Sequence, residues 1–306
     1  MTITGPRHTG KTTLTRALFP EHTYLSLEDP DTRMLAKDDP RSFFSRHQGP
    51  LILDEIQRVP ELTSYLQGIV DDPKNNHSYV ITGSHSQLLI EAVSQSLAGR
   101  TRILELLPFS WSEIKNFSPE LSLNEVLFHG GYPRIYEKKL NPTTWHKDYF
   151  KLYVEKDARQ IFNIRNLDLF ERFMPLLAER VGQLINYESL ANEVAASAPS
   201  IRQWLSVLES SYITYKLKPH FKKFNNGLEA NYYFWRDQHG HEVDLIEDLG
   251  NHLVPTEVKL SSTPHTQHSK NILYFNKLQK QNEGNVIYNG DAQERKGIHF
   301  LNWSKL

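Results

Sequence analysis

The feature that most constrains this chain is the sequence GPRHTGKT at residues 5–12, which we call the phosphate loop. It matches the pattern G-x-x-x-x-G-K-[ST], with β-branched residues before it and a helix-like segment, residues 12–18, after it. Its glycines let successive backbone N–H groups point inward, and a helix N-terminus adds positive potential at the same place. The loop and its flanks predict a parallel α/β sheet that binds a nucleoside triphosphate.

Individual residues of the phosphate loop have expected roles. Lys11 is expected to reach the β- and γ-phosphates, and the Thr12 hydroxyl is expected to ligate Mg²⁺. The predicted cofactors are therefore a nucleoside triphosphate and Mg²⁺. The predicted binding set is Gly5, Pro6, Arg7, His8, Thr9, Gly10, Lys11, Thr12 and Thr13.

The second half of such a site is an acidic strand end, and residues 51–55 (LILDE) supply one. The apolar run is short enough for a buried parallel strand. Asp54 then fits the acid that holds the Mg²⁺ water shell, and Glu55 fits the base that orients the attacking water. A buried strand that ends in solvated acids gives the same pattern, but the phosphate loop upstream favours the nucleotide site.

A further predicted strand, residues 79–84, ends in small polar residues. Ligands of parallel nucleotide-binding sheets lie at the carboxyl ends of the strands, so Thr82 or Ser84 is a candidate to sense the γ-phosphate. An ordinary strand-to-turn sequence would look the same, and both interpretations stay open.

Two arginines are candidates to stabilise charge during phosphoryl transfer. Arg7 lies within the phosphate loop, and Arg100 follows a predicted helix. An arginine supplied in cis or from a neighbouring subunit raises the rate of such reactions strongly. The alternative for Arg100 is a cation that interacts with the dipole at a helix C-terminus, after a glycine stop.

Composition excludes several classes of protein. The chain has 35 Lys and Arg against 36 Asp and Glu, a net charge of −1, so no global field draws it to DNA or to a membrane. It has no cysteine, which excludes disulfides and thiolate metal sites. No apolar run approaches 18 residues and no signal sequence opens the chain, so we expect a soluble cytoplasmic protein without a membrane partner.

The pattern changes along the chain. Residues 1–115 alternate strands and helices, with further strands at 23–27 and 104–108 and helices at 60–72 and 86–98, whereas residues 144–185 have the spacing of long helices. Helices at 186–194 and 201–208 and a strand at 212–217 then suggest a winged helix. Its reading helix has only Arg202 as a cation, which favours a packing module over a DNA-binding one.

The last segment predicts a strand at 232–235, a hairpin turn at 237–240 and return strands at 242–246 and 254–259. Asp244 with Glu257-x-Lys259 has the layout of a metal-dependent nuclease, in which two carboxylates bind Mg²⁺ and a lysine lies near the attacking water. Ordinary cross-strand ion pairs on a solvated sheet produce the same pattern, and the spacing alone favours them.

Many short stretches, in order, resemble the bacterial and archaeal AAA-type ATPases that carry a C-terminal domain of unknown function, DUF4143. These stretches are residues 5–14, 26–30, 53–57, 97–100, 107–110, 130–133, 155–157, 189–192, 204–209, 235–237 and 242–244. The resemblance implies an α/β P-loop NTPase sheet with a helical lid, a winged-helix-like segment and a small α+β domain resembling a truncated PD-(D/E)xK nuclease fold. The predicted boundaries are 1–115 for the ATPase core, 116–185 for the lid, 186–220 for the winged-helix-like segment and 221–306 for the C-terminal domain.

The chain departs from this family in two places. It begins one short strand ahead of the phosphate loop, where family members have several dozen residues, and it lacks the family's long insertion near residues 219–227. A nuclease-like fold without its first helix lacks one acid and part of its core, so we expect no cleavage and weak packing of the terminal strands.

The sequence therefore predicts a Mg²⁺-dependent ATPase whose nucleotide state moves its C-terminal domains, with Glu55, Lys11 and Arg100 as catalytic residues. Two alternatives stay open. One is a slow-turnover nucleotide switch that presents the C-terminal region to a protein or DNA partner. The other is a degenerate, inactive copy. Assembly into a homo-oligomer is possible, and the sequence does not determine the oligomeric state.

Overall fold

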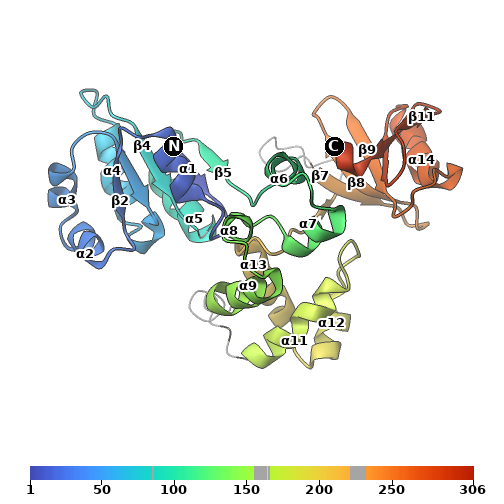
Figure 1. Ribbon diagram of the computed structural model, residues 1–306, viewed down its shortest axis with the longest axis horizontal. Helices are drawn as coiled ribbons and strands as arrows, with labels where there is room; N and C mark the ends of the chain where they lie inside the picture. Colours follow the sequence, from blue (N-terminus) through green and yellow to red (C-terminus); the bar gives the residue numbers. More distant parts are fainter. Residues whose placement is uncertain (85, 155–163, 165, 221–231) are drawn as a thin grey trace. The chain divides into compact units, whose positions relative to one another are not determined.

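A computed structural model describes residues 1–84, 86–154, 164, 166–220 and 232–306 (Figure 1). The chain divides into two compact units. The first unit comprises residues 1–179 and 185–214, and the second comprises residues 180–184 and 215–306. The four segment boundaries expected from the sequence stay predictions.

The first unit opens with a parallel five-stranded sheet, drawn from blue to cyan in Figure 1. Its strand order is β2-β3-β4-β1-β5, and every pairing is parallel. This confirms the predicted α/β class. The strands are β1 Thr2–Thr4, β2 Thr23–Ser26, β3 Leu51–Asp54, β4 Tyr79–Thr82 and β5 Ile103–Glu105.

Apolar side chains alternate between the two faces of this sheet, and both faces are buried. On one face, Leu51 and Leu53 pack with residues of the helices that follow β2, β3 and β4. On the other face, Ile52 packs with Ile3 and Val80, near Phe19 at the end of the first helix. Burial of both faces explains why residues 51–53 form a continuous apolar run.

In this α/β part, α1, α4 and α5 confirm the helices expected at 12–18, 60–72 and 86–98, whereas α2 and α3 were not predicted. Asp29 shows how one of them starts, because its carboxylate accepts the Thr32 backbone N–H at 2.8 Å ahead of Pro30. The helices are α1 Lys11–Leu18, α2 Pro30–Asp38, α3 Pro40–Arg46, the 3₁₀ turn η1 Ile56–Arg58, α4 Leu62–Val70 and α5 Ser86–Ser96.

The rest of the first unit is helical. Phe170 and Phe173 pack against Trp204 in one core that joins helices on both sides of residue 185. The predicted lid and winged-helix-like segments therefore share a core. The elements are α6 Trp111–Phe117, α7 Leu123–His129, α8 Pro133–Glu137, α9 Pro142–Tyr149, the π-helical turn η2 Phe150–Val154, α11 Leu167–Ala178, α12 Tyr187–Val194 and α13 Ala198–Ser210.

The strand predicted at 212–217 is wrong, because this segment has no strand. Tyr212 has a left-handed backbone with φ of 59°, and the N–H groups of Ile213 and Thr214 both point to the Leu208 carbonyl oxygen. The backbone donors that a strand would need are thus used to close the C-terminus of α13. The two helices of the predicted winged helix are present as α12 and α13, but residues 212–217 do not form its strand.

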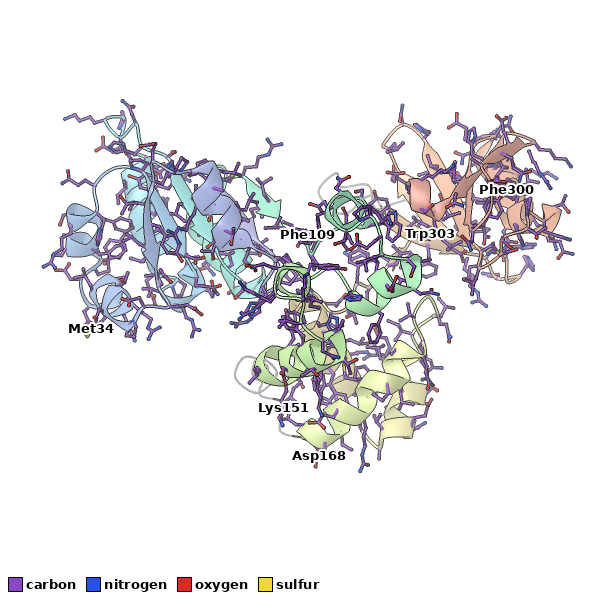
Figure 2. All side chains as sticks on the ribbon, viewed as in Figure 1. Met34, Phe109, Lys151, Asp168, Phe300 and Trp303 are labelled. Carbon is purple, nitrogen blue, oxygen red and sulfur yellow. The ribbon has the colours of Figure 1, made fainter. Side chains whose placement is uncertain are left out.

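The second unit is a mixed seven-stranded sheet with one main helix, in orange and red in Figure 1. Ile272 and Phe275 of that helix pack on the sheet, where Phe300, labelled in Figure 2, belongs to the core. The described terminal strands are therefore packed, contrary to our expectation. The strand order is β11-β12-β10-β9-β8-β7-β6. The elements are β6 Lys218–Pro219, β7 Tyr232–Arg236, β8 Glu242–Asp248, β9 Leu253–Val258, the 3₁₀ turn η3 Thr266–Ser269, α14 Lys270–Gln279, β10 Asn285–Tyr288, β11 Gln293–Arg295, β12 Ile298–Asn302 and the 3₁₀ turn η4 Trp303–Lys305.

Among the described helices, none combines the length and the apolar character needed to cross a lipid bilayer.

Candidate functional site

The phosphate loop joins β1 to α1 as the sequence predicts, and its shape depends on glycine at both ends. Gly5 has φ of 143°, and a Cβ there would overlap the Leu106 carbonyl oxygen, just after β5. Gly10 has φ of 91° and starts α1. Only glycine adopts such backbone conformations without strain, so the two positions fix the path of the loop.

Lys11 points back into the phosphate loop. Its Nζ donates hydrogen bonds to the carbonyl oxygens of Gly5 at 3.0 Å and Pro6 at 2.6 Å. Its side chain is buried, and this burial lowers the lysine pKa to about 8, although the nearby carboxylates of Glu55 and Asp54 raise it in part. The Thr9 hydroxyl also donates to the Pro6 carbonyl oxygen. The loop thus holds its cation close to where phosphate is expected.

The N-terminus of α1 is suited to an anion. Within the described part of the chain, no side chain caps this helix, whereas α2 and α3 begin with the capping side chains of Asp29 and Asp39. Uncapped N–H groups and the helix dipole together favour a negative ligand. Thr13, in the first turn, is exposed.

Asp54, at the end of β3, accepts hydrogen bonds from three hydroxyl groups. Thr12 and Tyr24 donate to its Oδ2 at 2.9 and 2.6 Å, and Thr82 donates to its Oδ1. Burial, together with the hydrogen bond to Asp54, raises the pKa of Tyr24 to about 12, so this phenol stays a donor. The aspartate carboxylate is therefore held from α1, β2 and β4 at once.

Glu55 leaves β3 with a left-handed backbone, φ 58° and ψ 46°. Its Oε2 accepts a hydrogen bond from the Ser84 hydroxyl at 2.9 Å and another from the Gln57 side-chain amide. Gln57 also donates to the Ser84 hydroxyl oxygen at 3.3 Å. The base expected from the sequence thus has two fixed donors.

The strand order explains why these residues meet. Because β4 lies between β1 and β3, the carboxyl end of β4 is next to both the phosphate loop and the acids. The Thr82 hydroxyl donates to the Asp54 carboxylate, and the Ser84 hydroxyl donates to the Glu55 carboxylate. Two residues at the end of β4 therefore each bind a different carboxylate. Sensing of the γ-phosphate by either residue stays a prediction.

The donor set suits a hard cation. The Thr12 hydroxyl and the Asp54 carboxylate are oxygen ligands, and they are within hydrogen-bond distance of each other. No group of three His, Asp or Glu side chains in metal-binding arrangement occurs among the described residues. Proteins usually bind Mg²⁺ through one or two oxygen ligands plus water and substrate phosphate.

His8 links the phosphate loop to the helical part of the same unit. Its backbone is left-handed with φ of 62°, and its ring lies edge-on to the rings of Trp145, at 6.3 Å, and Tyr149, at 6.2 Å, from α9. Burial and the charges of Arg134, Arg7 and Lys11 lower the pKa of His8. The imidazole is therefore neutral at physiological pH.

Arg100 lies apart from these contacts. Its guanidinium forms a paired interaction with Asp71, at 2.6 Å from Nε and 2.8 Å from Nη2, and also donates to the Ala98 carbonyl oxygen. Asp71 follows α4. Among the described residues, the hydrogen bonds of the Arg100 guanidinium are thus to Asp71 and Ala98, and not to Asp54 or Glu55. Roles for Arg7 and Arg100 in charge stabilisation stay predictions.

In the second unit, the three residues Asp244, Glu257 and Lys259 do meet. Lys259 Nζ contacts Glu257 and lies 3.3 Å from Asp244 Oδ2. Glu257 is only 2% exposed, and its burial raises the carboxyl pKa to about 7. The cross-strand ion pair expected from the spacing is present between Lys259 and the partly exposed Asp244, and the buried Glu257 pairs with Lys259 from two residues earlier in the chain. Glu242, two residues before Asp244 on β8, pairs with Arg236 at 3.1 Å.

Sequence reasoning missed two residues of the first site. Tyr24 was placed in a strand but given no role, because no motif marks it. Gln57 falls inside the stretch 53–57 that carries the family resemblance, and its distance of two residues from Glu55 was the only available signal.

Comparison with known families divides the chain into three matches. Residues 1–115 match an AAA domain, residues 120–237 match a domain of unknown function, DUF8612, and residues 216–306 match another, DUF4143. The AAA and DUF4143 matches confirm the resemblance inferred from the short stretches. The DUF8612 match was not expected, and it covers most of the helical part.

Similar proteins include uncharacterized proteins of Mycobacterium tuberculosis and Mycobacterium bovis, each 26% identical over 87% of this chain and 71% of the relative. Among solved structures, a single-residue variant of RuvB from Thermotoga maritima aligns with a TM-score of 0.34 at 17% identity, covering 69% of this chain and 79% of that one. The Aeropyrum pernix ORC1 protein in complex with DNA aligns with a TM-score of 0.32 at 13% identity, and the alignment covers 69% of this chain and 77% of that one. The chain thus combines a match to the AAA domain at residues 1–115 with a match to DUF4143 at residues 216–306, which is the combination that the short stretches resemble.

Proposed function

We propose that this chain binds ATP together with Mg²⁺ and hydrolyses ATP to ADP and phosphate. One observation carries the proposal: the 2.9 Å hydrogen bond from Thr12 to Asp54. It joins the start of the helix after the phosphate loop to the acidic end of β3, with Glu55 as the next residue. A loop for phosphate, an oxygen pair for a cation and a base are thereby within one site.

Each residue has a distinct role in the proposed reaction. The loop amides and Lys11 bind the β- and γ-phosphates, which requires Lys11 to leave the carbonyl oxygens of Gly5 and Pro6. Thr12 and Asp54 would hold Mg²⁺, which neutralises phosphate charge when bound. Glu55 accepts a proton from water, whose oxygen bonds to the γ-phosphorus as the bond to the β-phosphate oxygen breaks.

Contacts within the first unit support coupling of nucleotide state to its helices. His8 of the phosphate loop packs against Trp145 and Tyr149. In addition, the Thr4 hydroxyl, at the end of β1, lies 3.3 Å from the Tyr212 hydroxyl that follows α13. ATP entering the loop is expected to shift His8 and, through it, α9. We further propose that this shift of α9 moves the C-terminal domains when the nucleotide state changes.

A nucleotide switch with slow turnover is the second candidate, and the position of Lys11 favours it. Because Lys11 is bound to the loop's own carbonyl oxygens, ATP binding has to replace these hydrogen bonds first. In this case a protein or DNA partner would accelerate turnover. Arg202, the cation of the predicted reading helix, lies over the Tyr187 ring at 4.9 Å, which favours a protein partner.

The deciding experiment compares the purified chain with Glu55→Gln and with Glu61→Gln, an exposed glutamate just before α4. Hydrolysis of ATP and binding of labelled ATP are measured on the same samples with and without Mg²⁺. Hydrolysis that disappears only in Glu55→Gln, with binding retained, supports the ATPase. Binding without turnover in all three proteins supports the switch, and no binding in any of them excludes both.

A further inference from the structure

The turn after β3 brings the polar side chain of Gln57 against the candidate base Glu55. Because Glu55 has a left-handed backbone at the start of η1, the residue two positions later folds back toward it. The Gln57 amide donates to Oε2 of Glu55 and, at 3.3 Å, to the hydroxyl oxygen of Ser84. The Ser84 hydroxyl donates to the same Oε2 at 2.9 Å.

The three side chains form a closed ring in which every donor is used. Gln57 has two N–H protons, one for Glu55 and one for Ser84, and Ser84 has a single hydroxyl proton, which goes to Glu55. Reversing the Gln57 amide would place its carbonyl oxygen against the carboxylate, so that two acceptors would face each other. The network therefore fixes the orientation of the amide.

This orientation leaves the Gln57 carbonyl oxygen without a donor. Oε1 is buried and has no hydrogen-bond partner among the described residues. It lies against Gly83, where an added Cβ would overlap it. A buried acceptor without a donor costs stability, so such atoms require an explanation. Here the Gln57 amide is oriented so that its N–H groups donate to Glu55 and Ser84, and this orientation leaves Oε1 without a hydrogen bond among the described residues.

We propose that Gln57 is a positioning residue for ATP hydrolysis, which holds the Glu55 carboxylate, together with Ser84, where that carboxylate accepts a proton from the attacking water. The inference rests on the proposed function. Asp54 is held by three hydroxyls, whereas Glu55 depends on Gln57 and Ser84. Loss of Gln57 should therefore slow the chemical step and leave ATP binding intact.

The first test is Gln57→Leu, which keeps most of the side-chain volume and removes both the donors and the unpartnered oxygen. We expect kcat to fall about tenfold or more, within the range for a misplaced general base. The Kd for ATP and the thermal midpoint should not worsen. A lower thermal midpoint with an unchanged kcat of the folded protein would overturn the proposal, because a purely structural residue behaves in that way.

The second test is Gln57→Glu, which keeps the shape and sets a carboxylate against Glu55. Since a like charge disfavours the ionised base, the acid-side midpoint of the kcat–pH profile should move upward by about one pH unit. An unshifted profile contradicts the proposal. The matched controls are Gln95→Leu and Gln95→Glu, because Gln95 also donates to a glutamate, Glu91, but on the exposed face of α5.

Two failures remain distinguishable. If the unmodified chain binds no ATP or never hydrolyses it, the proposed function fails, and the role of Gln57 fails with it. If the unmodified chain hydrolyses ATP and both Gln57 variants match the Gln95 controls in kcat and pH profile, the role of Gln57 alone fails.

Discussion

The Thr12 hydroxyl donates a 2.9 Å hydrogen bond to Oδ2 of Asp54, a residue 42 positions later in the chain. The same carboxylate oxygen accepts the Tyr24 hydroxyl at 2.6 Å. These two donors come from α1 and from β2. The two side chains that the proposed function assigns to Mg²⁺ are thus held together by a hydrogen bond, and several outcomes follow for altered proteins.

Thr12→Val should strongly reduce Mg²⁺-dependent turnover and spare the fold. The substitution keeps the shape and removes the hydroxyl, so kcat/KM is expected to fall about a hundredfold, as for loss of one group that stabilises developing charge. Thr12→Ser, which keeps the hydroxyl, should retain activity. Steady-state ATP hydrolysis at several Mg²⁺ concentrations checks both. Equal rates in the valine and serine variants would contradict a role for the hydroxyl.

Tyr24→Phe should weaken the response to Mg²⁺ and leave the maximal rate nearly intact. The phenol orients Asp54 from outside the site, and loss of such a partner typically costs tenfold to a hundredfold in metal affinity, so the Mg²⁺ concentration for half-maximal activity should rise about tenfold. A Mg²⁺ titration at saturating ATP measures this. An unchanged midpoint would mean that Thr12 and Thr82 hold Asp54 without help.

ATP affinity should fall at alkaline pH. Burial lowers the pKa of Lys11 to about 8 in the free protein, and a bound phosphate raises it again, so ATP binding takes up a proton above that pH. Each pH unit above about 8 should therefore weaken binding by about tenfold. Titrations between pH 7 and pH 9.5 test this expectation. Lys11→Arg provides the control, because a guanidinium stays charged and its affinity should not follow pH.

Trp145 should report ATP binding through His8. The two rings are 6.3 Å apart, so a shift of the phosphate loop changes the surroundings of the indole. We expect ATP to change the tryptophan fluorescence of the chain, and His8→Ala to abolish the change while labelled ATP still binds. In a Trp145→Phe protein the signal should also disappear. A full signal in either variant would show that coupling follows another route.

The buried acid of the second unit should make stability fall as pH rises. Glu257 has a folded-state pKa of about 7, above that of an unfolded chain at about 4.3, so the folded state binds more protons between these values. The free energy of unfolding should therefore decrease from pH 5 to pH 7.5. Urea unfolding at both pH values tests this.

The matched substitutions for that experiment are Glu257→Gln and Glu242→Gln. The first removes the buried acid, so its stability should change less between the two pH values. The second removes an exposed glutamate that pairs with Arg236, and it should keep the dependence of the unmodified chain. Lys259 stays charged at both pH values and so does not contribute to the difference in stability between them. Although burial lowers its pKa, the bond and charge of Glu257 and the charge of Asp244 outweigh burial and raise it.

Those parts of the site that consist of consecutive residues could be predicted from the amino-acid sequence. The phosphate loop, Lys11 and Thr12 were predictable because a loop between a strand and a helix is specified by consecutive residues. The same holds for Asp54 and Glu55, at the end of a continuous apolar strand. The parallel sheet also followed, because apolar runs with both faces buried have few other arrangements.

The distant residues that contact them could be identified from the folded arrangement of the strands alone. The position of β4 between β1 and β3 is a property of strand order, and it sets Thr82 on Asp54 and Ser84 on Glu55. Tyr24 reaches the same aspartate from β2, and Gln57 reaches Glu55 through a left-handed turn. No pattern of consecutive residues encodes these contacts, because hydrogen bonds between side chains depend on the packing of the sheet as a whole.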